Sequence, residues 1–170
     1  MEFKYFDFLQ LKYGLGPLNL ECLKKDTNPY STLLCQCKGK LKFSNNFFGN
    51  SAPILAKRKF LSFFKTARER RSALVITPEY SCPWTVIEHL ANNPSELPAD
   101  NKIWAIGCES ISKEKIVTIK KMFHKKNNLI FHFDESILGS DKSFLDPLCY
   151  IFKVLFNPSG KAAQGSKNSE

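Results

Sequence analysis

The sequence contains no run of about 18 apolar residues, so a membrane-spanning helix is not expected. Its first residues, MEFKYFDFLQLKYG, place charged and polar side chains between the apolar ones, a pattern that does not fit a signal peptide. These two absences predict a cytoplasmic protein with no membrane partner. The sequence also shows no internal repeat and no recognisable nucleic-acid-binding motif.

Cysteine is present, but not with the spacing of a metal site. The pair Cys35-x-Cys37 has no second pair to complete a zinc motif, and the three histidines form no constellation with a Cys or an Asp. Cysteines 35, 108 and 149 lie in apolar runs, and cytoplasmic thiols stay reduced. We therefore expect free, mostly buried cysteines, with no metal and no cofactor.

The composition is that of a globular domain with a basic surface. The chain has 170 residues, of which 43% are hydrophobic and 15 are Phe, enough for one domain with a real core. The formal net charge is +9, from 25 Lys and Arg against 16 Asp and Glu, which favours acidic partners as a non-specific tendency. We expect an N-terminal extension (1–31), an α/β domain (32–160) and a polar tail (161–170).

Alternating apolar runs and amphipathic stretches predict the order β-α-β-α-β-α-β-β, typical of a layered α/β fold. Between the first strand and first helix, the turn formers of 38–50 indicate a polar connection. Helices are expected to begin at caps provided by Asn50 or Ser51, by Thr85 and by Ser112. The expected strands are 33–37, 73–77, 102–107, 129–133 and 148–155, and the expected helices end near 71, 91 and 126.

The stretch ALVITPEYSCPW carries the candidate chemistry. Ala73–Thr77 is short, apolar and β-branched, as in a strand buried on both faces, and Pro78 is expected to end it. Glu79 then stands at the carboxyl end of the strand, where α/β folds usually bind ligands. Beside Tyr80 and Trp84 its carboxylate would be partly desolvated and act as a base near neutral pH. Judged from the residues alone, a strand-end glutamate that simply faces water is the favoured interpretation.

Two basic clusters offer a second candidate site. Arg68, Arg70 and Arg71 follow one another near the end of the first helix, and Lys120, Lys121, Lys125 and Lys126 lie on the third. Both could contact phosphates, although positive charge at a helix end also complements the helix dipole and keeps a surface soluble.

Short motifs stand along the chain in a recognisable order. LLCQCK contains Gln36, ALVITPEYS contains Pro78-Glu79, KIWAIGCESI contains Gly107, and DPLCYIFKVLFNPSG contains Tyr150 and Gly160. In this order, and with a long amphipathic helix after the first, they resemble the N-terminal half of the nitrilase, or carbon–nitrogen hydrolase, superfamily. The resemblance spans 33–160. It implies an α-β-β-α sandwich, often paired into dimers, of which this chain carries an incomplete part.

The resemblance also implies a Glu–Lys–Cys triad acting on a small amide or nitrile. The cysteine attacks the substrate carbon, the glutamate moves protons, and the lysine stabilises the tetrahedral intermediate. Glu79 matches the glutamate, and Lys167 is the candidate lysine, with Lys161 the weaker one. No cysteine follows in the expected order, and a basic helix and extra strand are inserted at 112–146.

Three hypotheses follow. The chain is a nitrilase-like fragment that is inactive until a segment carrying the cysteine completes it. Alternatively, it is a non-catalytic nitrilase-like module that binds nucleic acid or a partner protein, as in the modules fused to reverse transcriptases of phage-defence type. The third alternative is an unrelated small α/β domain in which Glu79 has no catalytic role. Under the first, Glu79 should line a concave pocket, and the isolated chain should expose apolar strand faces and associate, for example as a homodimer.

Overall fold

The computed structural model describes residues 20–23, 30–36, 38–44, 47–124, 139, 144–145 and 148–152, all within one unit, Leu20–Lys153. Its helices are α2 (Pro53–Glu69), α3 (Trp84–Asn92) and α4 (Lys113–His124), with short 3-10 turns η1 (Glu21–Leu23) and η2 (Pro94–Glu96). Its strands are β1 (Thr32–Leu34), β2 (Leu41–Ser44), β3 (Phe47–Asn50), β4 (Leu74–Cys82), β5 (Ile103–Cys108), β6 (Ile111–Ser112), β7 (Phe144–Leu145) and β8 (Leu148–Phe152).

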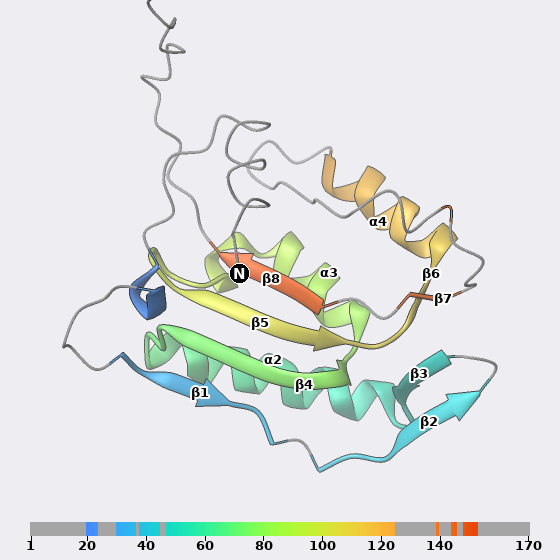
Figure 1. Ribbon diagram of the computed structural model, residues 1–170, viewed down its shortest axis with the longest axis horizontal. Coiled ribbons are helices and arrows are strands. Elements are labelled where there is room, and N and C mark those ends of the chain that lie inside the picture. Colours follow the sequence, from blue (N-terminus) through green and yellow to red (C-terminus); the bar gives the residue numbers. More distant parts are fainter. Residues whose placement is uncertain are drawn as a thin grey trace, which may run out of the picture. The chain divides into compact units, whose positions relative to one another are not determined.

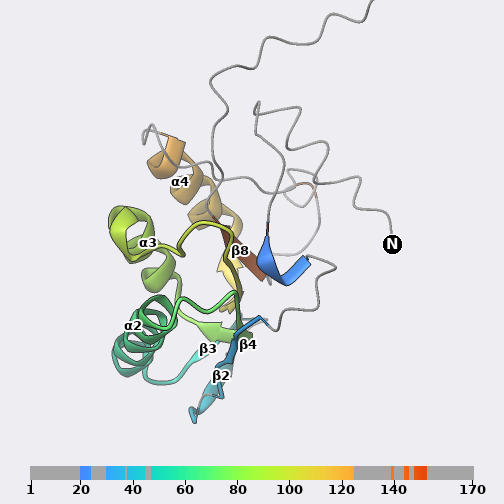
Figure 2. The ribbon, with the colours of Figure 1, turned by 90° about the vertical axis from the view of Figure 1, so that its left-hand side faces the viewer.

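The main sheet has the strand order β1-β4-β5-β8. Strands β1, β4 and β5 run parallel, with Leu33 opposite Val75 and Val75 opposite Trp104, and β8 joins antiparallel with Ile151 opposite Trp104. Figures 1 and 2 show that α2, α3 and α4 all cover the same face of this sheet. Because parallel strands alternate with covering helices, the chain has an α/β fold, as the element order predicted.

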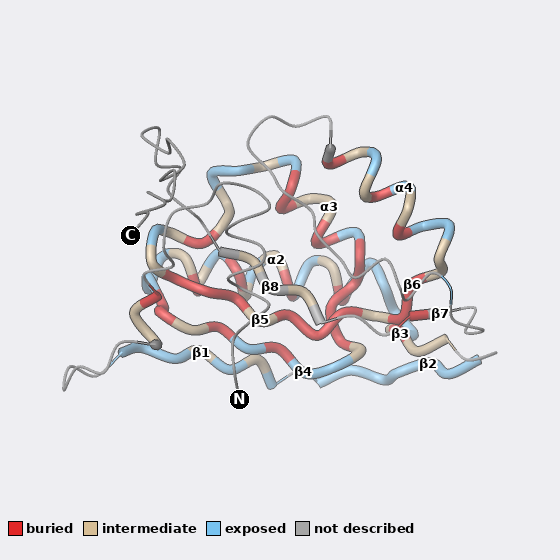
Figure 3. The backbone as a smooth tube through the Cα atoms, turned by 45° about the horizontal axis from the view of Figure 1, so that its top comes forward, coloured by how far each residue is buried: buried red, intermediate tan, exposed pale blue. Residues whose placement is uncertain are grey.

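The two faces of the sheet differ in burial. On the face toward the helices Val75 and Thr77 are 0% and 3% exposed, whereas on the other face Ile76 and Leu34 are 39% and 66% exposed. Figure 3 shows this alternation of buried and exposed residues along β4. Successive strand side chains point to opposite faces. The expectation that 73–77 is buried on both faces is therefore wrong, because Ile76 is exposed and the described helices cover only one face.

The core lies between the helices and the covered face of the sheet. The ring of Phe64 on α2 stacks on Trp104 of β5, with centroids 4.8 Å apart and planes at 13°. Phe123 contributes from α4, and each of these three residues is at most 2% exposed. Stacked, fully buried aromatic rings supply much of the apolar burial that stabilises a small domain.

Helix α2 begins without the expected cap. Ala52 is the N-cap residue, no side chain bonds the first backbone N–H groups, and Pro53 opens the first turn. Asn50, one of the two predicted caps, uses its side-chain amide elsewhere, as described below. Proline is tolerated at this position because its missing N–H would have no partner inside the helix. The prediction of the helix itself is confirmed, with its end at Glu69.

The other two helices begin differently from one another. Pro83 is the N-cap residue of α3, which starts at Trp84. The cap predicted at Thr85 is therefore wrong, because Thr85 lies inside the first turn of the helix. In α4 the hydroxyl oxygen of Ser112 accepts a hydrogen bond of 3.3 Å from the backbone N–H of Lys115. This is the geometry of a serine N-cap, so the cap predicted at Ser112 is confirmed.

The stretch 38–50, expected to be a polar connection, contains a β-hairpin. Strands β2 and β3 pair antiparallel, with Phe43 opposite Phe48 and Ser44 opposite Phe47. The turn formers Asn45-Asn46 connect the two strands in the sequence. The expectation is wrong because each strand has only four residues. So short a segment does not contain enough alternation of apolar and polar residues to indicate a strand.

Several predictions lie outside the described residues. They concern the N-terminal extension before Leu20, the strand expected at 129–133, the residue Cys37 and the polar tail 161–170 with Lys161 and Lys167.

Candidate functional site

The carboxyl end of β4 is irregular. Thr77 pairs with Ile106 and Cys82 pairs with Cys108, so the four residues 78–81 of β4 face the single residue Gly107 of β5. A Cβ atom on Gly107 would overlap the carbonyl oxygen of Pro78, so only glycine allows the two backbones to approach so closely. The sequence led us to expect that Pro78 ends the strand. This expectation is wrong, because β4 continues past Pro78, which opens a wide bulge.

Hydrogen bonds on both sides hold this bulge. The hydroxyl of Ser81 donates to the carbonyl oxygen of Pro78 at 2.5 Å, and the N–H of Gly107 donates to the hydroxyl of Thr77 at 3.0 Å. Tyr80 has φ = 56°, a left-handed conformation that is unusual for a residue other than glycine. Backbone in this region persists only where surrounding contacts impose it, and such positions cluster at functional sites.

Glu79 lies on the bulge and is exposed, which confirms the interpretation favoured from the residues alone, a strand-end glutamate that faces water. The expectation that it lines a concave pocket with little solvent exposure is wrong, because nothing in the described part of the chain covers the outer side of the bulge. Of its predicted neighbours, Tyr80 is half-buried, whereas Trp84 belongs to the core with 3% exposure. The indole N–H of Trp84 donates to the backbone oxygen of Glu109 at 2.8 Å. Tyr80 and Trp84 therefore do not form a pocket wall together with Glu79.

A row of three aromatic rings connects the hairpin to the bulge. The rings of Phe43 and Phe48 lie 4.5 Å apart, and those of Phe48 and Tyr80 lie 4.8 Å apart, both pairs tilted by about 35°. Contacts of this kind add to the free energy gained by burying the rings. Tyr80 thus packs against the hairpin rather than against a cavity beside Glu79.

Glu109 is a site residue that sequence reasoning missed. Its carboxylate oxygen Oε1 accepts hydrogen bonds from both the backbone N–H of Asn50, at 2.7 Å, and the side-chain amide of Asn50, at 2.8 Å. The same amide donates to the backbone oxygen of Ser81 at 2.8 Å. The hairpin, the loop after β5 and the bulge that carries Glu79 are therefore joined through one asparagine. The only sequence signal was a charged residue directly after an apolar strand, which also fits a solvated strand end.

Three cysteines lie side by side across the sheet, on β4, β5 and β8. Burial raises the pKa of Cys82, although a hydrogen bond from Cys108 lowers it. A hydrogen bond with Cys149 lowers the pKa of Cys108, yet its bond with Cys82 and its burial outweigh this and hold the pKa well above that of an ordinary thiol. The hydrogen bond with Cys108, together with burial, raises the pKa of Cys149 as well. Thiols with raised pKa values are poor nucleophiles near neutral pH.

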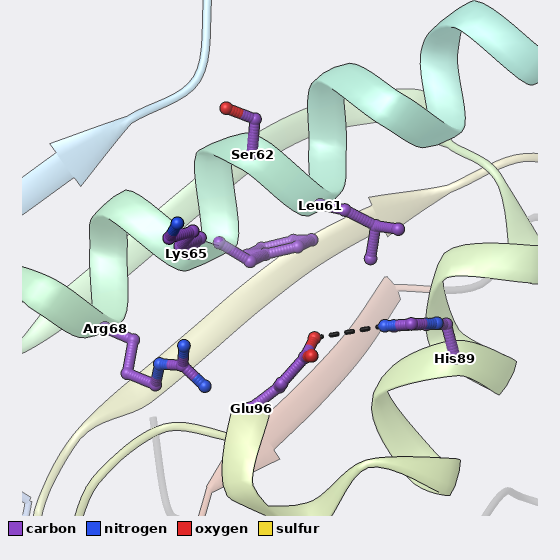
Figure 4. A pocket seen from close by; sticks show the side chains of 7 residues that line it. Leu61, Ser62, Lys65, Arg68, His89 and Glu96 are labelled. Carbon is purple, nitrogen blue, oxygen red and sulfur yellow. Dashed lines mark hydrogen bonds and ion pairs between the residues drawn. The ribbon is translucent and has the colours of Figure 1, made fainter.

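A hollow of about 310 Å³ lies between α2 and the segment formed by α3 and η2 (Figure 4). His89 Nε2 lies 3.1 Å from Glu96 Oε2, and a guanidinium N–H of Arg68 donates to the backbone oxygen of Ser95 at 2.7 Å. Figure 4 shows the hydroxyl of Ser62 directed away from this histidine. The hollow therefore has no Ser–His arrangement for nucleophilic catalysis, and its polar contacts attach η2 to α2.

A second hollow, of about 400 Å³, is lined by Ala52, Pro53, Ile54, Leu55 and Arg58 at the start of α2. Ile54 is 87% exposed, an unusual degree for an isoleucine.

The lysines expected to contact nucleic acid are only partly described. Lys120 and Lys121 lie on α4, the first half-buried and the second exposed, whereas Lys125 and Lys126 lie outside the described residues. Within the described ranges, no three His, Cys, Asp or Glu side chains are grouped so that they could hold a metal ion. The same residues include no helix that is long and apolar enough to cross a membrane.

Comparison with protein-family models, with curated proteins and with solved structures finds no match to this chain.

Proposed function

We propose that this chain forms part of a nitrilase-like carbon–nitrogen hydrolase, a sheet with the helices that cover one of its faces, in which Glu79 is the general base. The observation that carries the proposal is the position of Glu79. It follows Pro78 on a bulge at the carboxyl end of a parallel strand, opposite the glycine of the neighbouring strand. Pro-Glu on one strand and Gly on the next are two of the motifs on which the resemblance rests, and they lie side by side in the sheet.

The uncovered face of the sheet supports the same proposal. Ile76 and Leu34 leave apolar surface on the side that the described helices do not cover. A sandwich with two central sheets would bury this face against its second sheet, and exposed apolar strand faces usually mark an interaction surface.

The chemistry requires groups from outside the described residues. A cysteine beside Glu79 would attack the carbon of a small amide or nitrile and transfer its proton to the Glu79 carboxylate. A lysine, for which Lys167 is the candidate, would stabilise the tetrahedral intermediate. Covering the bulge with a further segment would exclude water from the Glu79 carboxylate, as the site of a general base requires. Because Cys82 and Cys108 are buried and Cys149 is half-buried, none of these thiols is placed to attack a substrate beside Glu79, and the chain alone should be inactive.

An amidase and nitrilase assay on the purified chain tests this assignment. Ammonia release from short aliphatic amides and nitriles should equal the buffer rate for the wild type, for Glu79→Gln and for the control Glu69→Gln, which alters an exposed glutamate on α2. Turnover that disappears only in Glu79→Gln would overturn the proposal that a missing cysteine prevents activity.

The mass of the chain in solution tests whether it is one half of such a sandwich, a single sheet with helices on one face. Analytical ultracentrifugation of the wild-type chain should give a mass above the 19.4 kDa of the monomer. The reason is that the uncovered apolar faces of two chains associate. Ile76→Lys should restore the monomer, whereas Ile54→Lys, which changes an exposed isoleucine on α2, should not. A wild-type chain that stays monomeric and binds no hydrophobic dye would favour an unrelated α/β domain instead.

A further inference from the structure

The sequence from 27 to 68 contains no acidic residue. Asp26 and Glu69 bound a stretch that carries eight basic residues and forms β1, the hairpin β2–β3 and helix α2. The basic residues are Lys38, Lys40, Lys42, Lys57, Arg58, Lys59, Lys65 and Arg68. This stretch therefore carries most of the chain's net charge of +9. Such a segregation of charge on neighbouring elements produces a field that attracts polyanions.

Six of these cations lie on the hairpin segment and the first turns of α2, where Lys57 is half-buried and the other five are exposed. The backbone N–H of Ser51 donates to the backbone oxygen of Lys40 at 3.0 Å, and the ammonium of Lys59 donates to the backbone oxygen of Lys38 at 3.2 Å. These bonds place the start of β2 beside the start of α2. Among the described residues, no carboxylate lies within ion-pair distance of Lys38, Lys40, Lys42, Lys57, Arg58 or Lys59.

An exposed aromatic side chain lies on the same hairpin segment as three of these lysines. Phe43 is 62% exposed, although its ring contacts Phe48, which in turn contacts Tyr80. Strand β2 is exposed along its whole length. Because strand residues two apart share a face, Lys40 and Lys42 project on the same side about 7 Å apart, while Phe43 points to the opposite side of the strand.

We propose that the hairpin β2–β3 and the start of α2 bind single-stranded nucleic acid. The six cations would contact successive phosphates, and the outer face of Phe43, at the end of the aromatic row, would stack on a base. Base–aromatic stacking beside a line of cations is how proteins hold single strands without reading their sequence. Lipid headgroups would satisfy the same cations, but a row of contacting rings matches stacked bases rather than a bilayer surface.

The proposal is independent of the hydrolase assignment, and it locates the interface away from the lysines of α4. The probe is a fluorescein-labelled oligothymidylate of about 20 nucleotides, longer than the site sizes usual for single-strand binders. Its anisotropy is titrated with the full chain at several salt concentrations between about 50 and 200 mM. Tight binding at low salt that weakens steeply as salt rises is the expected result.

Matched double variants identify the surface. Lys40→Glu/Lys42→Glu should weaken binding and lower the slope of log affinity against log salt by about 1.4, because each phosphate contact of a single strand contributes about 0.7. The control Lys120→Glu/Lys121→Glu on α4 should leave that slope within about 0.3 of the wild type. Phe43→Ala should weaken binding by about 5-fold to 150-fold, whereas Leu41→Ala should change it less than about 2-fold.

Thermal unfolding shows that each variant is folded, since exposed strand positions usually change stability by less than about 0.5 kcal/mol. If the hairpin and α4 double variants lose equal oligonucleotide affinity, the proposal is overturned, because the net charge of the chain would then explain the binding without a specific surface. It would also be overturned by an absence of oligonucleotide binding at low salt, or by binding to phosphatidylserine vesicles without binding to the oligonucleotide. The last result would assign the surface to anionic lipid.

Discussion

Gly107→Ala tests the bulge that carries Glu79. The added Cβ would overlap the carbonyl oxygen of Pro78 and approach the carbonyl carbon of Pro78 and the Cα of Glu79 at 2.5 and 2.6 Å. All three atoms belong to the backbone, so no side-chain rotation can relieve the overlap, and the bulge has to move away from β5.

The magnitude follows from the cost of overpacking. Inserting a methyl group into a filled site destabilises by about 1–3 kcal/mol, and a backbone neighbour places the expected value near the upper end, at about 2–3 kcal/mol. For a chain of this length each kcal/mol lowers Tm by about 2–4 °C, so Tm should fall by about 4–12 °C.

Thermal and urea unfolding of Gly107→Ala measure this loss, and Gly39→Ala is the matched control. A Cβ on Gly39 would meet only the side-chain oxygen of Asn50 at 3.8 Å, an ordinary van der Waals contact. Its stability should therefore stay within about 0.5 kcal/mol of the wild type. If Gly107→Ala is as stable as Gly39→Ala, the four-against-one register of the bulge is wrong and the position given to Glu79 loses its basis.

Two further changes test the surroundings of the bulge. Asn50→Ala should cost about 1–3 kcal/mol of unfolding free energy, because Glu109 and the carbonyl oxygen of Ser81 each lose a side-chain partner; a loss below about 0.5 kcal/mol would show that the amide does not join the hairpin to the bulge. Burial raises the pKa of Cys82, so this thiol ionises at a lower pH in the unfolded chain than in the folded one. The unfolding free energy should therefore fall as pH rises above about 8.5. The expected slope is about 1.4 kcal/mol per pH unit for each such thiol. Urea unfolding of Cys82→Ala should show a shallower fall, and an unchanged pH slope would contradict the shifted pKa.

The sequence predicted the elements that depend on local patterns. The helix over 53–69, the apolar strands on either side of α3 and the cap at Ser112 each follow from spacing within a few residues. Such signals are sufficient because hydrogen bonds within one helix turn, and the alternation of burial along one strand, depend on near neighbours.

The sequence did not predict the features that depend on distant partners. Asn50 looked like a helix cap, but its amide bonds to Glu109, 59 residues away along the chain. The bulge after Thr77 depends on Gly107, and a proline in the sequence was interpreted as the end of the strand. The exposure of Glu79, by contrast, agrees with the interpretation favoured from its residues alone, and only the pocket implied by the resemblance is missing. No pattern within a single segment indicates which distant residue completes a site.

The anchoring of the hairpin has a consequence for the order in which the chain acquires its structure. A two-stranded hairpin is at most marginally stable in water by itself, and its polar anchor Glu109 lies 59 residues after Asn50. At ribosomal rates of about 5–20 residues per second, Glu109 is synthesised roughly 3–12 s after Asn50. During this interval the hairpin lacks the carboxylate that accepts both hydrogen bonds of Asn50, and until Tyr80 is made the ring of Phe48 lacks its partner on β4. The nascent chain should therefore be most prone to chaperone binding and self-association before β5 is complete.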